Sequence, residues 1–166
     1  LHVRSRRQRQ MCIRDSFTYM RQPNGKFRYN CSIIDLYDRS AVASLNSDCI
    51  NTDLAINTLK TALKKEKHPK VILHSDHGVQ FTSCEFVNFC KDNNITQSMS
   101  KASCLYDNAP MERFYNTFKN CFYYRYTFES VEQLDEMTKQ YINWYNYVRP
   151  HSTNNYMTPM EFRYRA

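Results

Sequence analysis

Apolar and polar positions alternate over short stretches early in the chain and follow a helical period later. The turn signal Pro23-Asn24-Gly25 separates two strand-like runs, which is typical of a hairpin. Further along, Leu54, Ile56 and Leu59 lie near helical spacing. The pattern predicts strands at 17–20, 27–36, 41–46, 71–76 and 95–98, and helices at 52–65, 83–92, from 108 onward and at 131–147. This order predicts a single mixed α/β layer architecture.

Capping residues support the helix starts. Asn51 or Thr52 is expected to cap the first helix, and Thr82 or Ser83 the second. Pro110 falls in the first turn of the third helix, where the missing N–H of proline is tolerated.

The first sixteen residues differ from the rest. Arginine and glutamine alternate there with no strand or helix period. Residues 1–16 are therefore interpreted as a leader, either a disordered basic arm or a non-native peptide of the kind produced when sequencing-adapter DNA is translated. The second interpretation is favoured, and 17–166 is expected to be the folded domain with a C-terminal helical tail.

Charge changes this picture only slightly. The net charge is +7, but the leader contributes five arginines against one aspartate, leaving +3 for the other 150 residues. A mildly basic body is compatible with DNA binding without being diagnostic of it. A 42% hydrophobic content argues against a mostly disordered chain, and no apolar run is long enough to span a membrane.

Cysteine usage favours a reducing compartment. Seven cysteines are scattered without a Cys-x-x-Cys pair, and neither a disulfide framework nor a structural zinc site fits that spacing. The expected compartment is the reducing cytosol.

Two carboxylates carry the strongest candidate chemistry. Asp76 ends a buried strand and Gly78, close behind it, allows a tight turn. Glu112 lies in the first turns of a helix, and 35 residues lie between the two acids. A carboxylate at a strand end near one on a helix can supply hard oxygen ligands to Mg²⁺. Each acid also has an ordinary explanation, a turn cap for Asp76 and a surface charge for Glu112.

The helix that carries Glu112 adds a polar face. Asn116 at i+4 and Lys119 at i+7 share that face with Glu112, so they could reach a DNA phosphate beside the metal. A surface ion pair has the same appearance. Arg149 could likewise contact phosphate or only complement a helix end. For the tyrosines and Trp144 around it, helical spacing favours packing in the core over base stacking.

Three ordered segments carry a resemblance. The first is HSDHGVQFTS at 74–83. The second contains QSMS at 97–100, YDNA at 106–109 and Glu112. The third, near the end of the sequence, contains WYN at 144–146, RPH at 149–151 and TPMEF at 158–162. The segments resemble bacterial insertion-sequence transposases of the two-reading-frame type, which have a retroviral-integrase-type catalytic core. The match spans about 17–162 and includes the 35-residue gap.

The resemblance implies a ribonuclease-H-like fold with a mixed central sheet flanked by helices. It implies an Asp-Asp-Glu site in which Asp76 and Glu112 bind Mg²⁺ or Mn²⁺, with two ions expected. It also implies DNA cleavage and strand transfer at transposon ends and target DNA, a homo-oligomer on DNA, and a helix-turn-helix partner from an upstream reading frame. Lys119 occupies the position of the family's basic residue near the transposon end, and Cys121 replaces a further acid.

The first aspartate departs from the family pattern. The family places Asp directly before an apolar-Thr-Tyr run, but here Ser16 precedes Phe17 and Asp15 is one residue too early. Because side chains alternate across a strand, Asp15 should face the wrong side unless a bulge corrects it. Impaired catalysis is therefore expected. A non-catalytic nucleic-acid-binding remnant and a ribonuclease-H-like nuclease remain alternatives.

Overall fold

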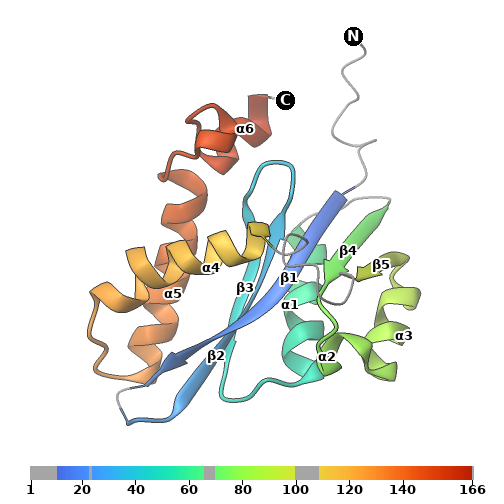
Figure 1. Cartoon of the computed structure of the whole chain (residues 1–166), viewed down its shortest axis with the longest axis horizontal. Helices are drawn as coiled ribbons and strands as arrows, with labels where there is room; N and C mark the ends of the chain where they lie inside the picture. The colour runs from blue at the N-terminus through green and yellow to red at the C-terminus, as the bar shows by residue number, and fades with distance from the viewer. Residues whose placement is uncertain (1–10, 23, 66–69, 100–108, 166) are drawn as a thin grey trace.

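A computed structural model describes residues 11–22, 24–65, 70–99 and 109–165. Five strands form one sheet in the order β3-β2-β1-β4-β5 (Figure 1). The strands are β1 (Met11–Arg21), β2 (Phe27–Asp35), β3 (Ala41–Ser47), β4 (Val71–Ser75) and β5 (Ile95–Met99). β1, β2 and β3 are antiparallel neighbours, whereas β4 pairs in parallel with both β1 and β5. The predicted mixed sheet is confirmed.

Helices cover both faces of this sheet (Figure 1). They are α1 (Thr52–Lys65), α2 (Val79–Thr82), α3 (Cys84–Asp92), α4 (Ala109–Cys121), α5 (Val131–Tyr147) and α6 (Pro159–Arg165), with the 3-10 turns η3 (Tyr123–Arg125) and η4 (Ser152–Asn154). α1, α2 and α3 bury one core with the sheet, whereas α4 and α5 bury a second core on its other face. This is the layered arrangement that the order of elements predicted.

The helix starts follow the capping residues. Asn51 Oδ1 accepts a hydrogen bond from Leu54 N–H at 2.9 Å, and the Ser83 side chain accepts one from Phe86 N–H at 3.3 Å. Both caps satisfy a backbone donor that the first turn leaves without an intrahelical partner. The predicted bounds of α1 and α5 agree with the structure, whereas Asn108 lies outside the described residues.

The start of β1 corrects one prediction. The first strand was expected to begin at Phe17, but it begins at Met11. Met11 and Ile13 are 1% exposed and pack in the same core as Phe17. The strand period was present in the sequence, but the surrounding arginines and the inward-facing Asp15 concealed it. Residues 11–16 are therefore part of the sheet and not a disordered arm.

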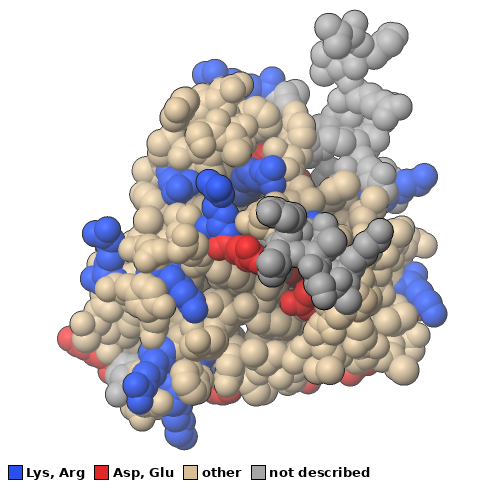
Figure 2. All heavy atoms as spheres, viewed as in Figure 1, with Lys and Arg blue, Asp and Glu red and all other residues tan. Residues whose placement is uncertain are grey.

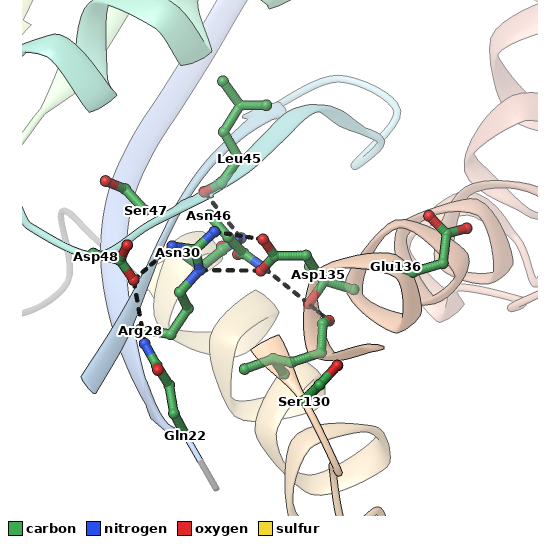
Figure 3. Close-up of polar contacts among 12 residues, drawn as sticks. Gln22, Arg28, Asn30, Leu45, Asn46, Ser47, Asp48, Ser130, Asp135 and Glu136 are labelled. Atoms are coloured by element: carbon green, nitrogen blue, oxygen red, sulfur yellow. Dashed lines mark hydrogen bonds and ion pairs between the residues drawn. The ribbon is translucent and has the colours of Figure 1, made fainter. Parts of the chain in front are cut away.

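A polar network fixes α5 on the sheet (Figure 3). Arg28 of β2 donates to both carboxylate oxygens of Asp135 on α5, and to Asp48 at 2.7 Å. Asn46 of β3 also donates to Asp135, at 2.8 Å. The hydrogen bonds to Asp135 raise the pKa of Arg28 above its usual value. The network thereby holds the start of α5, and with it the connector from α4.

The C-terminal segment is anchored by a buried ion cluster. Arg163 of α6 is 5% exposed and donates through Nε to Asp38 and through Nη2 to Ser40 at 2.8 Å. Asp35 lies 3.4 Å from the same guanidinium. Asn154 adds a hydrogen bond to the Asp38 carbonyl. α6 was not predicted from the sequence, and this cluster is what holds it. In the described part of the chain, no helix combines the length and apolarity needed to cross a membrane.

Candidate active site

The candidate site lies where β4 ends beside the middle of β1. Pairing of β1 with β4 runs in parallel up to His74, which is opposite Arg14. Continuing that register by two residues places Asp76 level with Ser16. The carboxyl ends of neighbouring parallel strands are where α/β sheets usually bind ligands. Ser16 therefore occupies the strand position that adjoins Asp76.

Asp76 is held by the turn that follows β4. Its Oδ1 accepts a hydrogen bond from Gly78 N–H at 2.8 Å, so the residue does cap the turn. Gly78 has φ −55°, which any residue can adopt. A Cβ there, however, would lie 2.8 Å from Asp76 Oδ1. A larger residue at position 78 would therefore have to displace the Asp76 carboxylate, so glycine matters here for the position of that carboxylate and not for backbone freedom, as the sequence suggested.

Glu112 is exposed in the first turn of α4. Tyr115, one turn later, anchors this helix over β1. Its hydroxyl donates to the Ser16 carbonyl at 2.6 Å and accepts from Ser32 N–H at 3.0 Å. Burial raises the pKa of Tyr115 well above its usual value, so the hydroxyl keeps its proton. Tyr115 thus fixes α4, the helix that carries Glu112, over Ser16 of β1.

Asp15 points to the opposite face of the sheet. Pairing of β1 with β2 is continuous from Ile13 to Arg21, so no bulge shifts the register. Ile13 and Phe17, which share a face with Asp15, pack in the core beneath α1 and α3. The predicted one-residue offset is therefore confirmed. Asp15 is 2% exposed, and its Oδ1 has no hydrogen-bond partner among the described residues.

This burial perturbs the Asp15 carboxyl. Desolvation, reinforced by the negative charge of Asp76, raises the pKa of Asp15 well above its usual value. Because the folded state holds this proton more tightly than the unfolded state, Asp15 favours folding most at low pH. That contribution is lost as the pH rises from near 4 through the folded-state pKa.

Replacing Asp15 by asparagine should therefore stabilise the protein at alkaline pH. We expect Asp15→Asn to raise the free energy of unfolding by roughly 1–3 kcal/mol at pH 9, the usual cost of an unsatisfied buried group. The gain should shrink toward zero near pH 4. Urea unfolding of both proteins at pH 4, 7 and 9 measures it. Asp53→Asn, at an exposed acid in the first turn of α1, is the control, and an equal gain at every pH would contradict the assignment.

The polar face of α4 extends away from Glu112. Asn116 is exposed and accepts a hydrogen bond from Asn120. Lys119 is half-buried, with Nζ 4.5 Å from the centre of the Tyr19 ring on β1. Acidic side chains gather at the centre of the face in Figure 2, with lysines and arginines over the α4 region beside them. The predicted Glu–Asn–Lys stripe is therefore solvent-accessible, and Lys119 is held by an aromatic ring instead of an ion pair with Glu112.

Arg149 lies just beyond α5. Its guanidinium is 5.7 Å from the centre of the Tyr145 ring, and Nη1 lies 3.2 Å from His151 Nε2. Burial, with Arg149 adding to it, lowers the pKa of His151 to about 4, so the imidazole is neutral at pH 7. Tyr145 is buried as predicted, but Trp144 is 38% exposed. The prediction of core packing therefore holds for Tyr145 and fails for Trp144.

The oxygen ligands at the site are of the type that a divalent metal prefers, but there are too few carboxylates among them. Asp76 and Glu112 offer hard carboxylate oxygens, which Mg²⁺ prefers. Ser16 adds only a neutral hydroxyl where the family pattern has a third carboxylate. No cluster of three or more His, Cys, Asp or Glu side chains suited to a metal occurs among the described residues. The set is one acid short.

Tyr115 is the site residue that sequence reasoning missed. Only the polar face of this helix carried a prediction from the sequence, and Tyr115 lies on its buried side. The Tyr115 hydroxyl makes the hydrogen bond to Ser16 that fixes α4 on β1. The helical period of apolar residues cannot reveal such a bond, because a tyrosine and a phenylalanine fit a buried position equally well. Its spacing of three residues from Glu112 was the available signal.

Comparisons with known proteins agree with this geometry. A family model described as "Integrase core domain" matches residues 6–104, and a second model of the same description matches residues 93–159. The putative transposase InsK of insertion sequence IS150, from Escherichia coli K12, is 34% identical over 142 residues, which is 84% of this chain and 50% of InsK. An uncharacterized transposase-like protein of Haemophilus influenzae is 33% identical, over 86% of this chain and 72% of that protein. The chain spans about half the length of InsK.

Solved structures share the fold at low sequence identity. A chain of the simian T-cell lymphotropic virus intasome, solved in complex with PP2A regulatory subunit B56 gamma, superposes with a TM-score of 0.82 at 16% identity. It covers 97% of this chain and 56% of that one. The HTLV-2 integrase catalytic core domain in complex with magnesium gives 0.71 at 15% identity, over 91% of this chain and 94% of that one. The fold is ribonuclease-H-like, as expected, and the chain belongs to the integrase core domain family, among the insertion-sequence transposases.

Proposed function

We propose that this chain is the catalytic core of a DNA transposase, which cleaves DNA strands and transfers them to a target. One observation carries the proposal. Asp76 follows the end of β4, which pairs with β1 just before Ser16, and Tyr115, one turn after Glu112 on α4, donates a hydrogen bond to the Ser16 carbonyl. Such an arrangement would let the two acids share metal ions, as a two-metal site for phosphodiester chemistry needs.

Asp76 and Glu112 would hold Mg²⁺ or Mn²⁺, and we propose two ions by analogy with the family. Such ions stabilise the attacking and leaving oxygens of an in-line displacement. The protein's own contribution is to position the acids, because the Gly78 N–H orients Asp76 and Tyr115 fixes the helix of Glu112. Asn116, Lys119 and Arg149 would contact DNA phosphates. The likeness to InsK and to an intasome chain supports DNA as the partner, with a homo-oligomer assembled on it.

The serine at position 16 favours a reduced catalytic activity. The hydroxyl cannot supply the charge that a carboxylate brings to the metal, and Asp15 faces the other core. The second candidate function is therefore a DNA-binding remnant with the same fold, and the same observation favours it. A separate protein or domain with a helix-turn-helix, encoded upstream, would supply recognition of the transposon ends.

Metal binding and DNA nicking can be tested on the same protein. We expect Mn²⁺ to broaden the amide NMR signals of Asp76 and Glu112 together, because a paramagnetic ion acts on all nearby nuclei. We also expect weak, Mn²⁺-dependent nicking of supercoiled plasmid that Asp76→Asn and Glu112→Gln abolish. Glu132→Gln is the matched control, since Glu132 is also exposed in the first turn of a long helix.

The outcomes separate the two candidates. Broadening with no nicking identifies the remnant. Broadening at neither residue, or at only one of them, contradicts the shared site. Nicking that persists in both acid variants contradicts the proposed catalytic residues.

A further inference from the structure

α4 and the connector after it contact β1 at several positions, and the connector reaches the end of this strand. β4 pairs with β1 only over Met11–Arg14, so the later part of β1 has no described strand on that side. Tyr115 contacts Ser16, Lys119 contacts Tyr19, and the Tyr123 hydroxyl accepts a hydrogen bond from Arg21 N–H at 2.6 Å. α4 and η3 therefore follow β1 residue by residue, from the candidate active site to the end of the strand.

A cavity of about 360 Å³ lies at the end of this path. It is lined by Arg21, Gln22, Tyr123, Tyr124, Tyr126, Thr127 and Phe128. Tyr124 is 65% exposed and Tyr126 is 54% exposed, so two aromatic rings are open to solvent. Tyr123 packs in parallel against Phe128 with ring centres 6.1 Å apart, which gives the cavity a firm aromatic wall.

The charges around the cavity favour a polyanion. Arg21 belongs to the lining, and Arg125 follows Tyr124 in η3. No acid is part of the lining among the described residues. The neighbouring cavity, which shares Gln22, has both signs of charge in its lining, with Lys26 beside Asp48 and Glu132. A nucleic-acid backbone would therefore be attracted more strongly to the tyrosine cavity than to the next one.

We propose that this cavity stacks an unpaired base of the DNA strand that leaves the active site. The inference rests on the proposed function, because it assumes that DNA is bound at Glu112. Exposed aromatic rings beside basic side chains bind single strands by stacking, and every base offers a π-face to them. The occupant is an unpaired nucleotide and not a duplex, since the base must leave its pair to reach Tyr124 and Tyr126.

The length of α4 sets the spacing. From Glu112 to Cys121 the helix rises by roughly 13 Å at ~1.5 Å per residue. That length corresponds to about four steps of DNA whose bases stay stacked 3.4 Å apart, up to the one base that leaves the stack. The base in the cavity should therefore lie about four to five nucleotides from the phosphate bound near Glu112, with Lys119 between them.

Binding of end-labelled DNA by the full chain tests this inference. Fluorescence anisotropy would compare a blunt duplex with the same duplex carrying a six-nucleotide single-stranded extension, on the 3′ or the 5′ strand. We expect one of the two extended duplexes to bind about tenfold more tightly than the blunt duplex, which corresponds to ~1.4 kcal/mol. Shortening that extension to two nucleotides should abolish the gain.

Variants identify the cavity as the source. Tyr124→Ala with Tyr126→Ala should remove the gain while leaving blunt-duplex binding and the melting temperature unchanged, whereas the two Tyr→Phe changes should retain it. Tyr164→Ala is the matched control, because Tyr164 is 72% exposed on α6, at the opposite end of the molecule from the end of β1 (Figure 1).

The result that contradicts base stacking in the cavity differs from the result that contradicts the proposed transposase function. Absence of any DNA binding, blunt or extended, would contradict the proposed function itself. Normal blunt-duplex binding with no preference for an extension would contradict only the cavity. A preference for the extended duplex that survives the double alanine change would also contradict the role of the cavity. A double alanine change that alters only the oligomeric state would contradict it as well.

Discussion

Ser16→Asp is expected to raise metal-dependent DNA nicking by about 100-fold or more. Ser16 lies level with Asp76 and beneath the α4 turn of Glu112, so a carboxylate there would complete a set of three. Metal ions supply several kcal/mol of charge stabilisation in such reactions, and each 1.4 kcal/mol is worth about tenfold in rate. Nicking of supercoiled plasmid in Mg²⁺ and in Mn²⁺ measures the change.

Two matched variants decide what the new residue does. Ser16→Asn has nearly the shape of aspartate without its charge and should give no increase. Asp15→Asn, made together with Ser16→Asp, should leave the restored activity intact because Asp15 faces the other core. If Asp15→Asn abolished activity, or if Ser16→Asn matched Ser16→Asp, the assignment of the strand position would be wrong.

Arg163→Ala is expected to have the largest effect on stability. The change leaves Asp35 and Asp38, which are 1% and 0% exposed, buried without their cationic partner. Breaking a buried ion pair from one side costs roughly 3–5 kcal/mol. For a domain of this size the melting temperature should fall by roughly 6–20 °C.

Thermal and urea unfolding test this expectation. Arg165→Ala, at an exposed arginine on the same helix, should change the free energy of unfolding by less than about 0.5 kcal/mol. Adding Asp38→Asn to Arg163→Ala should recover part of the loss, because one uncompensated charge is then removed. A loss below about 1 kcal/mol in Arg163→Ala would mean that the cluster holds α6 weakly.

Local sequence signals predicted most of the elements. α1 and α5 were found with their limits because an apolar period begins next to a capping residue in each. The mixed α/β layer architecture followed from the run of three strands and the later alternation with helices. These features depend on neighbouring residues, which is why they can be read without a structure.

Features that depend on distant partners could not be predicted in the same way. Arg163 contacts Asp38 across more than a hundred residues, and an isolated charge in the sequence is normally solvated. The first six residues of β1 were missed because Asp15 interrupts an apolar face, and a buried unpaired acid is rare. For Gly78, the sequence indicated only a tight turn. The structure shows that a Cβ at this position would lie 2.8 Å from the Asp76 carboxylate, which a sequence cannot reveal.

The Arg163 cluster also bears on shortened copies of this protein. A polypeptide that ends before position 163 would retain Asp35 and Asp38 in a dry interior without Arg163. Such a fragment would populate unfolded forms that cellular proteases degrade. The buried cluster would therefore make the survival of a copy in the cell depend on whether it includes α6.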